Sequence, residues 1–307
     1  MSDGLLLWGA LLLPFGLLLV AAAAASMSAA LGDAAAGRPV TGLTLVQPVQ
    51  EAARLLVVRR RRTVHPDALL WRVGGGTLFL TAVLAAAVVP IGQTPVVRYE
   101  AGVVWFNAAE TLLWAALWLT GWGANSALGL VGGYRFLAQA LAYELPMMLA
   151  LITAALGAGS LDVVQVAAAQ DGLWFVVWMP VAFVVFLIAA LGFSFWGPFS
   201  HPVGADAAGG VLAELSGVDR LVVLIGRYAW LAAAAGMSVP LFLGGGAGPL
   251  LPSWLWWLAK TLAVLALLVW ARWRWPVVRV DRFEEIAWVV LLPAVLLQTL
   301  VVSLVVI

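Results

Sequence analysis

Long apolar runs, separated by short polar connections, occupy most of the chain. Runs of about twenty apolar residues are long enough to cross a bilayer as helices, whereas a membrane β-barrel shows alternating segments of about ten residues. We predict eight spans: Gly4–Ala25, Leu69–Ile91, Gly102–Trp122, Tyr134–Ala158, Leu173–Phe195, Leu221–Leu243, Trp254–Ala271 and Ile286–Ile307. The pattern predicts an all-α polytopic membrane protein that forms one integral membrane domain over residues 1–307.

The connection between the first two spans has a helical pattern of its own. Apolar residues recur there at helical spacing, at Leu45, Pro48, Val49, Ala52, Leu55 and Leu56. This pattern predicts an amphipathic helix that lies along the membrane surface. The basic run Arg59–Arg62 follows it and is either an anchor for lipid headgroups or a docking patch for a soluble subunit.

Arginines predict the orientation in the membrane, because Lys and Arg are retained on the cytoplasmic side of short loops. They gather after spans one, three, five and seven, at Arg38, Arg54, Arg59, Arg60, Arg61, Arg62, Arg72, Arg135, Arg220, Arg272, Arg274, Arg279 and Arg282, whereas the opposite connections hold Arg98. The segment Met1–Asp3 lacks the basic residues of a signal peptide, so we keep the first span as a retained helix. Both termini are then expected outside the inner membrane of the cell.

Composition narrows the chemistry further. The chain is 64% hydrophobic and 10% charged, whereas soluble domains have about 25% charged residues, so the expected surroundings are a lipid bilayer and not a nucleic acid. With no cysteine, the chain forms no disulfide and offers no thiolate to a metal or an iron–sulfur cluster. His65 and His201 are far apart in sequence, so we predict no metal site. Many of the seventeen tryptophans fall at span ends and are interpreted as interfacial anchors.

Four charged residues fall inside predicted spans, where ionisable groups are costly and often functional. They are Glu110, Glu144, Arg227 and Lys260. Glu110 and Glu144 suit a proton or ion relay, or one of them pairs with Arg227 as a neutral structural lock. Glu144 is expected near the cytoplasmic end of its span. Lys260 is near enough to a span end to reach the interface along its own stem.

A polar stretch enters the fourth span and carries a family resemblance. Its residues are Gly121-Trp122, Asn125-Ser126, Gly132, Arg135, Ala138-Gln139 and Tyr143-Glu144-Leu145-Pro146. This segment resembles the signature of the H subunit of bacterial NADH-quinone oxidoreductase, respiratory complex I, which is equivalent to mitochondrial subunit 1. Membrane-bound hydrogenases and formate hydrogenlyases contain relatives of that subunit. Leu45 to Leu56, His65 to Gly92 and Pro276 to Pro293 resemble it in the same order.

The resemblance implies a subunit between a soluble redox arm on the cytoplasmic side and antiporter-like and small membrane subunits. In that family it helps to form the quinone chamber and starts the polar path that couples quinone reduction to proton pumping. We expect no catalytic residue of its own, a quinone as the possible ligand, and iron–sulfur clusters and flavin only on partner subunits. The candidates for the proton path are Glu144, Arg135, Gln139, Glu110 and Arg227. Those for the quinone chamber or cytoplasmic loop are Gln47, Phe199, Asp206 and Glu214.

The loop after the fifth span departs from the family pattern. The family has Pro-Phe-Asp followed by further carboxylates, whereas this chain has Pro198-Phe199-Ser200 and keeps Glu214, with Asp206 as a partial substitute. The family's Glu-Tyr-Ala at the start of the sixth span is Arg227-Tyr228-Ala229 here. Fewer carboxylates leave fewer groups to supply protons to a quinone. A second hypothesis is therefore a structural anchor and ion-translocation coupling subunit of a hydrogenase-like complex that binds no quinone.

Overall fold

The computed structural model describes residues 3–204 and 209–306, and apart from one isolated β-bridge their regular structure is helical. The α-helices are α1 (Asp3–Ala35), α2 (Gly42–Val57), α3 (Ala68–Ala87), α4 (Gly102–Gly123), α5 (Ala127–Ala158), α6 (Val163–Ala168), α7 (Phe175–Trp178), α8 (Pro180–Phe193), α9 (Gly217–Phe242), α10 (Ser253–Arg274), α11 (Val280–Ile286) and α12 (Leu292–Val306). Two 3₁₀ turns, η1 (Gly197–Phe199) and η2 (His201–Val203), follow α8, and a π-helical turn, η3 (Ala287–Leu291), joins α11 to α12. Seven described helical segments are long and apolar enough to cross a membrane, which confirms the predicted all-α polytopic class.

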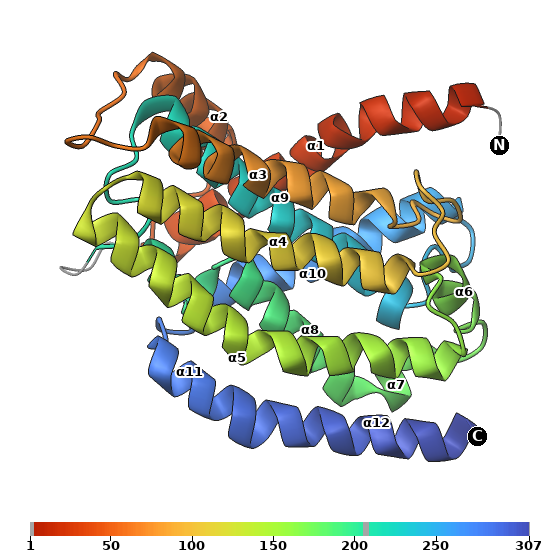
Figure 1. Ribbon diagram of the computed structural model, residues 1–307. Helices are drawn as coiled ribbons and strands as arrows, with labels where there is room; N and C mark the ends of the chain where they lie inside the picture. Colours follow the sequence, from red (N-terminus) through yellow and green to blue (C-terminus); the bar gives the residue numbers. More distant parts are fainter. Residues whose placement is uncertain (1–2, 205–208, 307) are drawn as a thin grey trace.

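The start of α1 and the end of α12 lie at the same end of the helix bundle (Figure 1). The α4–α5 turn, the connection from α8 to α9 and the start of α11 lie at the other end, where the arginine-rich connections also fall. Placing both termini at one end requires an even number of passes, and the short helix α8 supplies the pass that the seven long segments lack.

The fifth predicted span is not the continuous helix that its apolar run suggests. The helix breaks between Met179, which has φ −122° and ψ 46°, and Pro180, the first residue of α8. Proline has no N–H to continue the hydrogen-bond ladder but suits the first turn of a new helix. Because α8 has 14 residues, it rises only about 21 Å, less than the hydrocarbon core of about 30 Å. Its irregular ends are tolerated because α5, α9 and α12 pack around it.

Two other helices extend furthest beyond their predicted ends. α1 continues to Ala35, and α5 starts at Ala127 rather than near Tyr134. With 32 residues, α5 is about 48 Å long and extends past the hydrocarbon core. Glu144 therefore lies near the middle of α5 rather than near its start.

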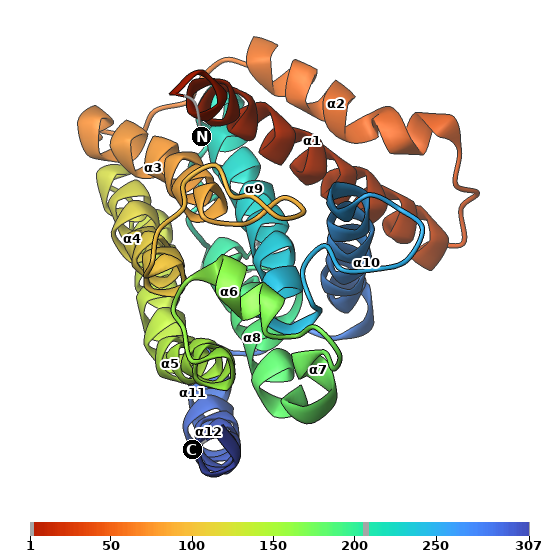
Figure 2. The same cartoon turned by 90° about the vertical axis from the view of Figure 1, so that its right-hand side faces the viewer.

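The predicted amphipathic helix is present as α2, which packs beside α1 and α9 (Figure 2). Its side chains Leu43, Val49 and Leu56 are exposed, the pattern of a helix at a membrane surface. The Thr44 hydroxyl donates to Asp33 Oδ2 at 2.7 Å and ties α2 to the end of α1. On the outer side of α2, the Arg54 guanidinium donates to Glu51 and holds the pKa of that carboxyl below its ordinary value.

Helix α9 forms the centre of the bundle and contacts α1, α3, α8 and α10. Its small residues Ala232–Ala235 are buried and let the neighbouring backbones approach closely. Beside them, the Trp230 ring packs against Phe106 of α4 and Phe193 of α8 at centroid distances of 6.0 and 5.4 Å. This aromatic core joins α9 to α4 and α8, which flank the polar residues described next.

Candidate functional site

The polar stretch around residue 125 forms the tight turn between α4 and α5. Asn125 has φ 44° and donates its side-chain amide to the Val64 carbonyl at 2.9 Å. A Cβ on Gly121 would lie 2.5 Å from the carbonyl oxygen of Gly129, so only glycine permits this approach of the two helices. The close approach aligns the polar side chains of α4 with those of α5.

One face of α5 carries polar side chains at intervals of four residues, which places them in a row along the helix. Arg135 donates to the Gly209 carbonyl at 2.8 Å, and Gln139 donates to the Gly192 carbonyl at 2.8 Å. Tyr143 is the next residue of the row, and its hydroxyl donates to Glu110 Oε1 of α4 at 2.6 Å. The row thus runs from the loop after α8 into the middle of the bundle.

Glu110 and Glu144 meet where α4 faces α5. Glu110 is fully buried, and the Glu144 carboxyl is close enough to act on it electrostatically. Glu144 Oε1 accepts a hydrogen bond from Asn107 at 2.9 Å and a longer one from Thr111 at 3.5 Å. The predicted path residues Arg135, Gln139, Glu144 and Glu110 are therefore brought together along two adjacent helices.

Three oxygens of this cluster are buried without a hydrogen-bond partner among the described residues: Asn107 Oδ1, Glu110 Oε2 and Glu144 Oε2. An ionised carboxylate only accepts hydrogen bonds, whereas a protonated one also donates. Leaving buried polar atoms unsatisfied is costly, so the cluster requires an added proton or water. Two adjacent carboxyls in this setting can take up and release a proton.

The loop after α8 packs on the start of α5. The Ser126 hydroxyl donates to Glu214 Oε1 at 2.7 Å, which places Glu214 beside the α4–α5 turn. Phe199 instead packs on Phe283 of α11, with ring centroids 4.3 Å apart. Gln47 is exposed on α2, a helix that packs on α1 and α9 rather than on the polar row. Asp206 lies outside the described residues.

Arg227 does not form the predicted lock with Glu110 or Glu144, since no ion pair between described residues joins it to either carboxyl. Its guanidinium donates to the Phe195 carbonyl at 2.6 Å and stacks over the Trp196 ring at 4.6 Å. Cations are favoured at the C-terminal end of a helix and over an indole face. Arg227 therefore binds the backbone just beyond the end of α8.

Lys260 is also held by the protein, at the loop that follows α9. Its ammonium donates to the carbonyls of Leu243, Gly245 and Ala247 at 2.7, 3.0 and 2.8 Å. The indole of Trp174 lies 4.1 Å away and completes the site. These contacts satisfy backbone acceptors at the C-terminal end of α9, which is a structural role.

Replacing Lys260 with methionine should lower the thermal stability of the purified complex without changing proton translocation per electron pair in the assembled fraction. Each carbonyl that loses its donor in a buried setting costs about 1–3 kcal/mol. Thermal unfolding of the variant is compared with that of Arg72→Met, which removes an exposed arginine. Equal stability of the two variants would contradict the structural role of Lys260.

Several residues of the cluster escaped the sequence-based prediction. Asn107, Thr111 and Ser126 are uncharged, whereas charge was the signal that marked the candidates inside the spans. Asn107 and Thr111 are four residues apart on α4 and flank Glu110, so polar residues at helical spacing were the signal that could have found them. Ser126 and Tyr143 were included in the family segment but not among the site residues.

Comparison with known proteins agrees with the resemblance of the signature segment. The chain matches the family model described as NADH dehydrogenase over residues 5–303. It is 34% identical over 268 residues to NADH-quinone oxidoreductase H subunit 1 of Geobacter metallireducens, and the match covers 84% of this chain and 82% of that relative. It is 32% identical over 257 residues to the NADH-quinone oxidoreductase H subunit of Geobacillus kaustophilus, and that match covers 81% of this chain and 77% of the relative.

The matched region includes the α4–α5 cluster, the α8 break and the amphipathic helix. Its seven long apolar segments agree with relatives that are subunits of a bacterial membrane complex. This multi-pass membrane protein therefore belongs to the NADH dehydrogenase family, in which its relatives are the H subunits of NADH-quinone oxidoreductase, membrane subunits of respiratory complex I.

Proposed function

We propose that this chain links the soluble redox arm of a complex I-like oxidoreductase to its proton-pumping arm and passes protons through the Glu110–Glu144 pair. The observation that carries the proposal is the group of buried oxygens without partners on Asn107, Glu110 and Glu144 among the described residues. Such a group gains hydrogen bonds when it binds a proton and loses them when it releases one. Its protonation is therefore coupled to the packing of α4 against α5.

The polar row supplies a route between this pair and the loop after α8. From Ser126 to Tyr143 the helix axis rises about 26 Å, and Arg135 and Gln139 lie between them. Ser126 holds Glu214, a carboxylate that can exchange protons with the aqueous side. Quinone reduction consumes protons. A chamber near this loop would therefore draw protons from Glu214 and from the polar row. The family membership and the packing of the loop on α5 support the quinone part of the proposal.

Partners follow from the same arrangement. The arginine-rich end is assigned to the cytoplasmic side, where the soluble arm with its flavin and iron–sulfur clusters would bind, and both termini are assigned to the outside. Thr111 and Leu112 are exposed on α4 beside the cluster, so this face would carry the contact with antiporter-like or small membrane subunits. A quinone would be the small ligand of the chamber.

One observation favours the second candidate function, a coupling and anchoring subunit of a hydrogenase-like complex without a quinone. Arg227 occupies the position where the family resemblance leads us to expect a carboxylate, and its guanidinium binds the Phe195 carbonyl just beyond α8. A structural cation at that position adds no proton-carrying group to the loop. The α4–α5 pair would then couple ion movement to a different redox module.

Replacement of Glu144 by glutamine tests the proposal. Glutamine keeps an acceptor for Asn107 but cannot bind and release a proton, so proton translocation should fall at least about tenfold while the complex stays assembled. Quinone reduction and proton uptake are measured in the same membrane vesicles, with the exposed Glu100→Gln as the matched control. Unchanged translocation in the Glu144 variant would refute the proton path. Oxidation of the redox module's donor without any quinone reduction in the wild type would favour the second candidate.

A further inference from the structure

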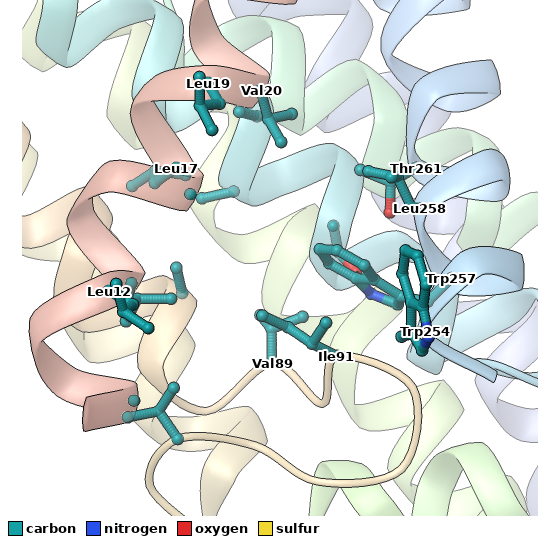
Figure 3. Close-up of a pocket in the computed structure, with 18 residues that line it drawn as sticks. Leu12, Leu17, Leu19, Val20, Val89, Ile91, Trp254, Trp257, Leu258 and Thr261 are labelled. Atoms are coloured by element: carbon teal, nitrogen blue, oxygen red, sulfur yellow. The ribbon is translucent and has the colours of Figure 1, made fainter. Parts of the chain in front are cut away.

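A cavity of about 480 Å³ lies away from the polar row, between α1, the end of α3, α9 and α10 (Figure 3). Its lining comes from the first half of α1, between Gly9 and Val20, and from the first turns of α10, between Trp254 and Thr261. Both segments belong to the end of the bundle where the termini lie. The volume is within the range of about 300–1,000 Å³ that is usual for small-molecule sites.

The wall of the cavity offers almost nothing but carbon. Leu12, Leu17 and Val89 are typical of the lining. The indole N–H of Trp257 is already donated to the Gly236 carbonyl at 3.3 Å. Thr261 contributes the only side-chain hydroxyl of the lining, and this residue is fully buried in the wall. The Thr261 hydroxyl has no hydrogen-bond partner among the described residues, so it is available to a ligand. A ligand with several polar groups would still lose most of its hydrogen bonds to water, whereas a hydrocarbon chain has none to lose.

The cavity exists because the first half of α1 leans away from the bundle, as Figure 1 shows. A Cβ built on Gly16, which lines the cavity, meets no atom within 4 Å. An empty apolar volume forfeits dispersion contacts on every side, so in a bilayer it is filled by hydrocarbon. A transmembrane helix does not match this space. Such a helix is about 10–12 Å wide and runs the full depth of the membrane, whereas the cavity is confined to one half of α1.

The mouth of the cavity differs from its interior. Trp254 lies at the start of α10 with half of its surface exposed, and indoles at that position favour the headgroup level of a bilayer. We propose that the cavity binds one acyl chain of a membrane phospholipid, with the ester region of the lipid beside Trp254. The lipid fills the wedge between α1 and α10 and holds α1 against α9. This site is independent of the proposed proton path, because neither α4 nor α5 lines it.

Photo-cross-linking of the intact complex tests this site. The complex is reconstituted with a phospholipid that carries a diazirine in the half of one acyl chain next to the ester, and the labelled peptides are identified by mass spectrometry. Labelling of 9–20 and 254–261 should exceed that of the exposed α12 residues Leu297 and Leu304 roughly tenfold, as about 1.4 kcal/mol of preferential binding gives. Equal labelling of these segments means ordinary annular lipid and would overturn the proposal.

A variant that fills the cavity provides a second test of the lipid site. Gly16→Leu places a branched side chain in the empty volume, so labelling of 254–261 should fall roughly tenfold. The matched control is Gly76→Leu, because Gly76 is exposed on α3 and also has no neighbour for a Cβ, but does not line the cavity. If labelling of 254–261 persists in Gly16→Leu, the lipid does not occupy the cavity and the proposal fails.

Two further probes of the wild-type complex distinguish a phospholipid from an isoprenoid tail and from a partner subunit. The test therefore does not depend on the variant. A prenyl chain with the same diazirine reports an isoprenoid tail, and preferential labelling by it over the acyl probe would overturn the proposal. Photoactivatable leucine, incorporated in place of leucine during expression, reports a partner subunit. A protein cross-link from 9–20 together with absent lipid labelling would also overturn the proposal. Preferential labelling by the acyl probe, displaced by excess unlabelled phospholipid, supports it.

Discussion

Glu110→Gln is expected to reduce proton translocation by about a hundredfold or more while the complex still assembles. Glutamine has the shape of glutamate and still accepts the hydrogen bond from Tyr143, so the packing of α4 on α5 is retained. The variant has no carboxyl to exchange a proton with Glu144. Because Glu110 is fully buried, no bulk water reaches this position to replace its carboxyl. The fall in proton translocation should therefore be larger for Glu110→Gln than for Glu144→Gln, since Glu144 is half-buried.

The measurement is proton uptake per electron pair in sealed vesicles, with quinone reduction followed in parallel. Groups that act as one unit are not additive, so the Glu110→Gln, Glu144→Gln double variant should be no worse than Glu110→Gln alone. Glu100→Gln again serves as the control for loss of an exposed carboxyl. Additive losses in the double variant would mean two separate routes and would contradict a shared proton.

Tyr143→Phe distinguishes a positioning role from a direct one. The hydroxyl of Tyr143 fixes one oxygen of Glu110, while the other oxygen has no partner among the described residues. Its removal should weaken translocation less than Glu110→Gln does, because the exchanging carboxyl is still present. It should also shift the pH dependence of translocation, a change that a residue acting only in packing would not produce.

The architecture could be predicted because the length of an apolar run is limited directly by the thickness of a bilayer. The same rule did not predict the break at Pro180. A proline within an apolar run fits either a kinked helix or the first turn of a new one, and the neighbouring helices decide between them. The extended start of α5 was missed for a related reason, since residues 127–133 are glycine-rich and the helix there is held by packing on α4.

The residues of the site could be predicted from the sequence, but their contacts could not. Glu110 and Glu144 fall in neighbouring predicted spans, where charge alone suggests that one of them should pair with Arg227. The structure favours the Phe195 carbonyl as the partner of Arg227, because that group lies at the end of a broken helix that no sequence rule had located. The adjacency of Glu110 to Glu144 depends on the rotation of α4 against α5, which the glycine contact at Gly121 sets.

Another close approach joins the polar row to the loop after α8, and it involves Gly132. A Cβ on this residue would lie 2.2 Å from the Val211 nitrogen and 2.7 Å from the Pro202 oxygen. Both are backbone atoms, and the Val211 amide is itself bonded to the Pro202 carbonyl at 2.9 Å, so they cannot separate to admit a side chain. One turn further along α5, Arg135 binds the same loop at Gly209.

Gly132→Ala is therefore expected to displace the loop from α5 and to reduce both assembly of the subunit and quinone reduction. Forcing one methyl group into such a contact costs about 1–3 kcal/mol when neighbours can shift, and here the neighbours are bonded backbone. The adjacent Gly133→Ala is the matched control, because a Cβ there meets Trp118 at an ordinary 3.4 Å. Assembly is measured by the amount of subunit in the purified complex, and loop displacement by protease cleavage within 200–216. If Gly132→Ala and Gly133→Ala assemble and resist cleavage equally, the loop is not held by this contact, and Glu214 would reach the polar row by another route.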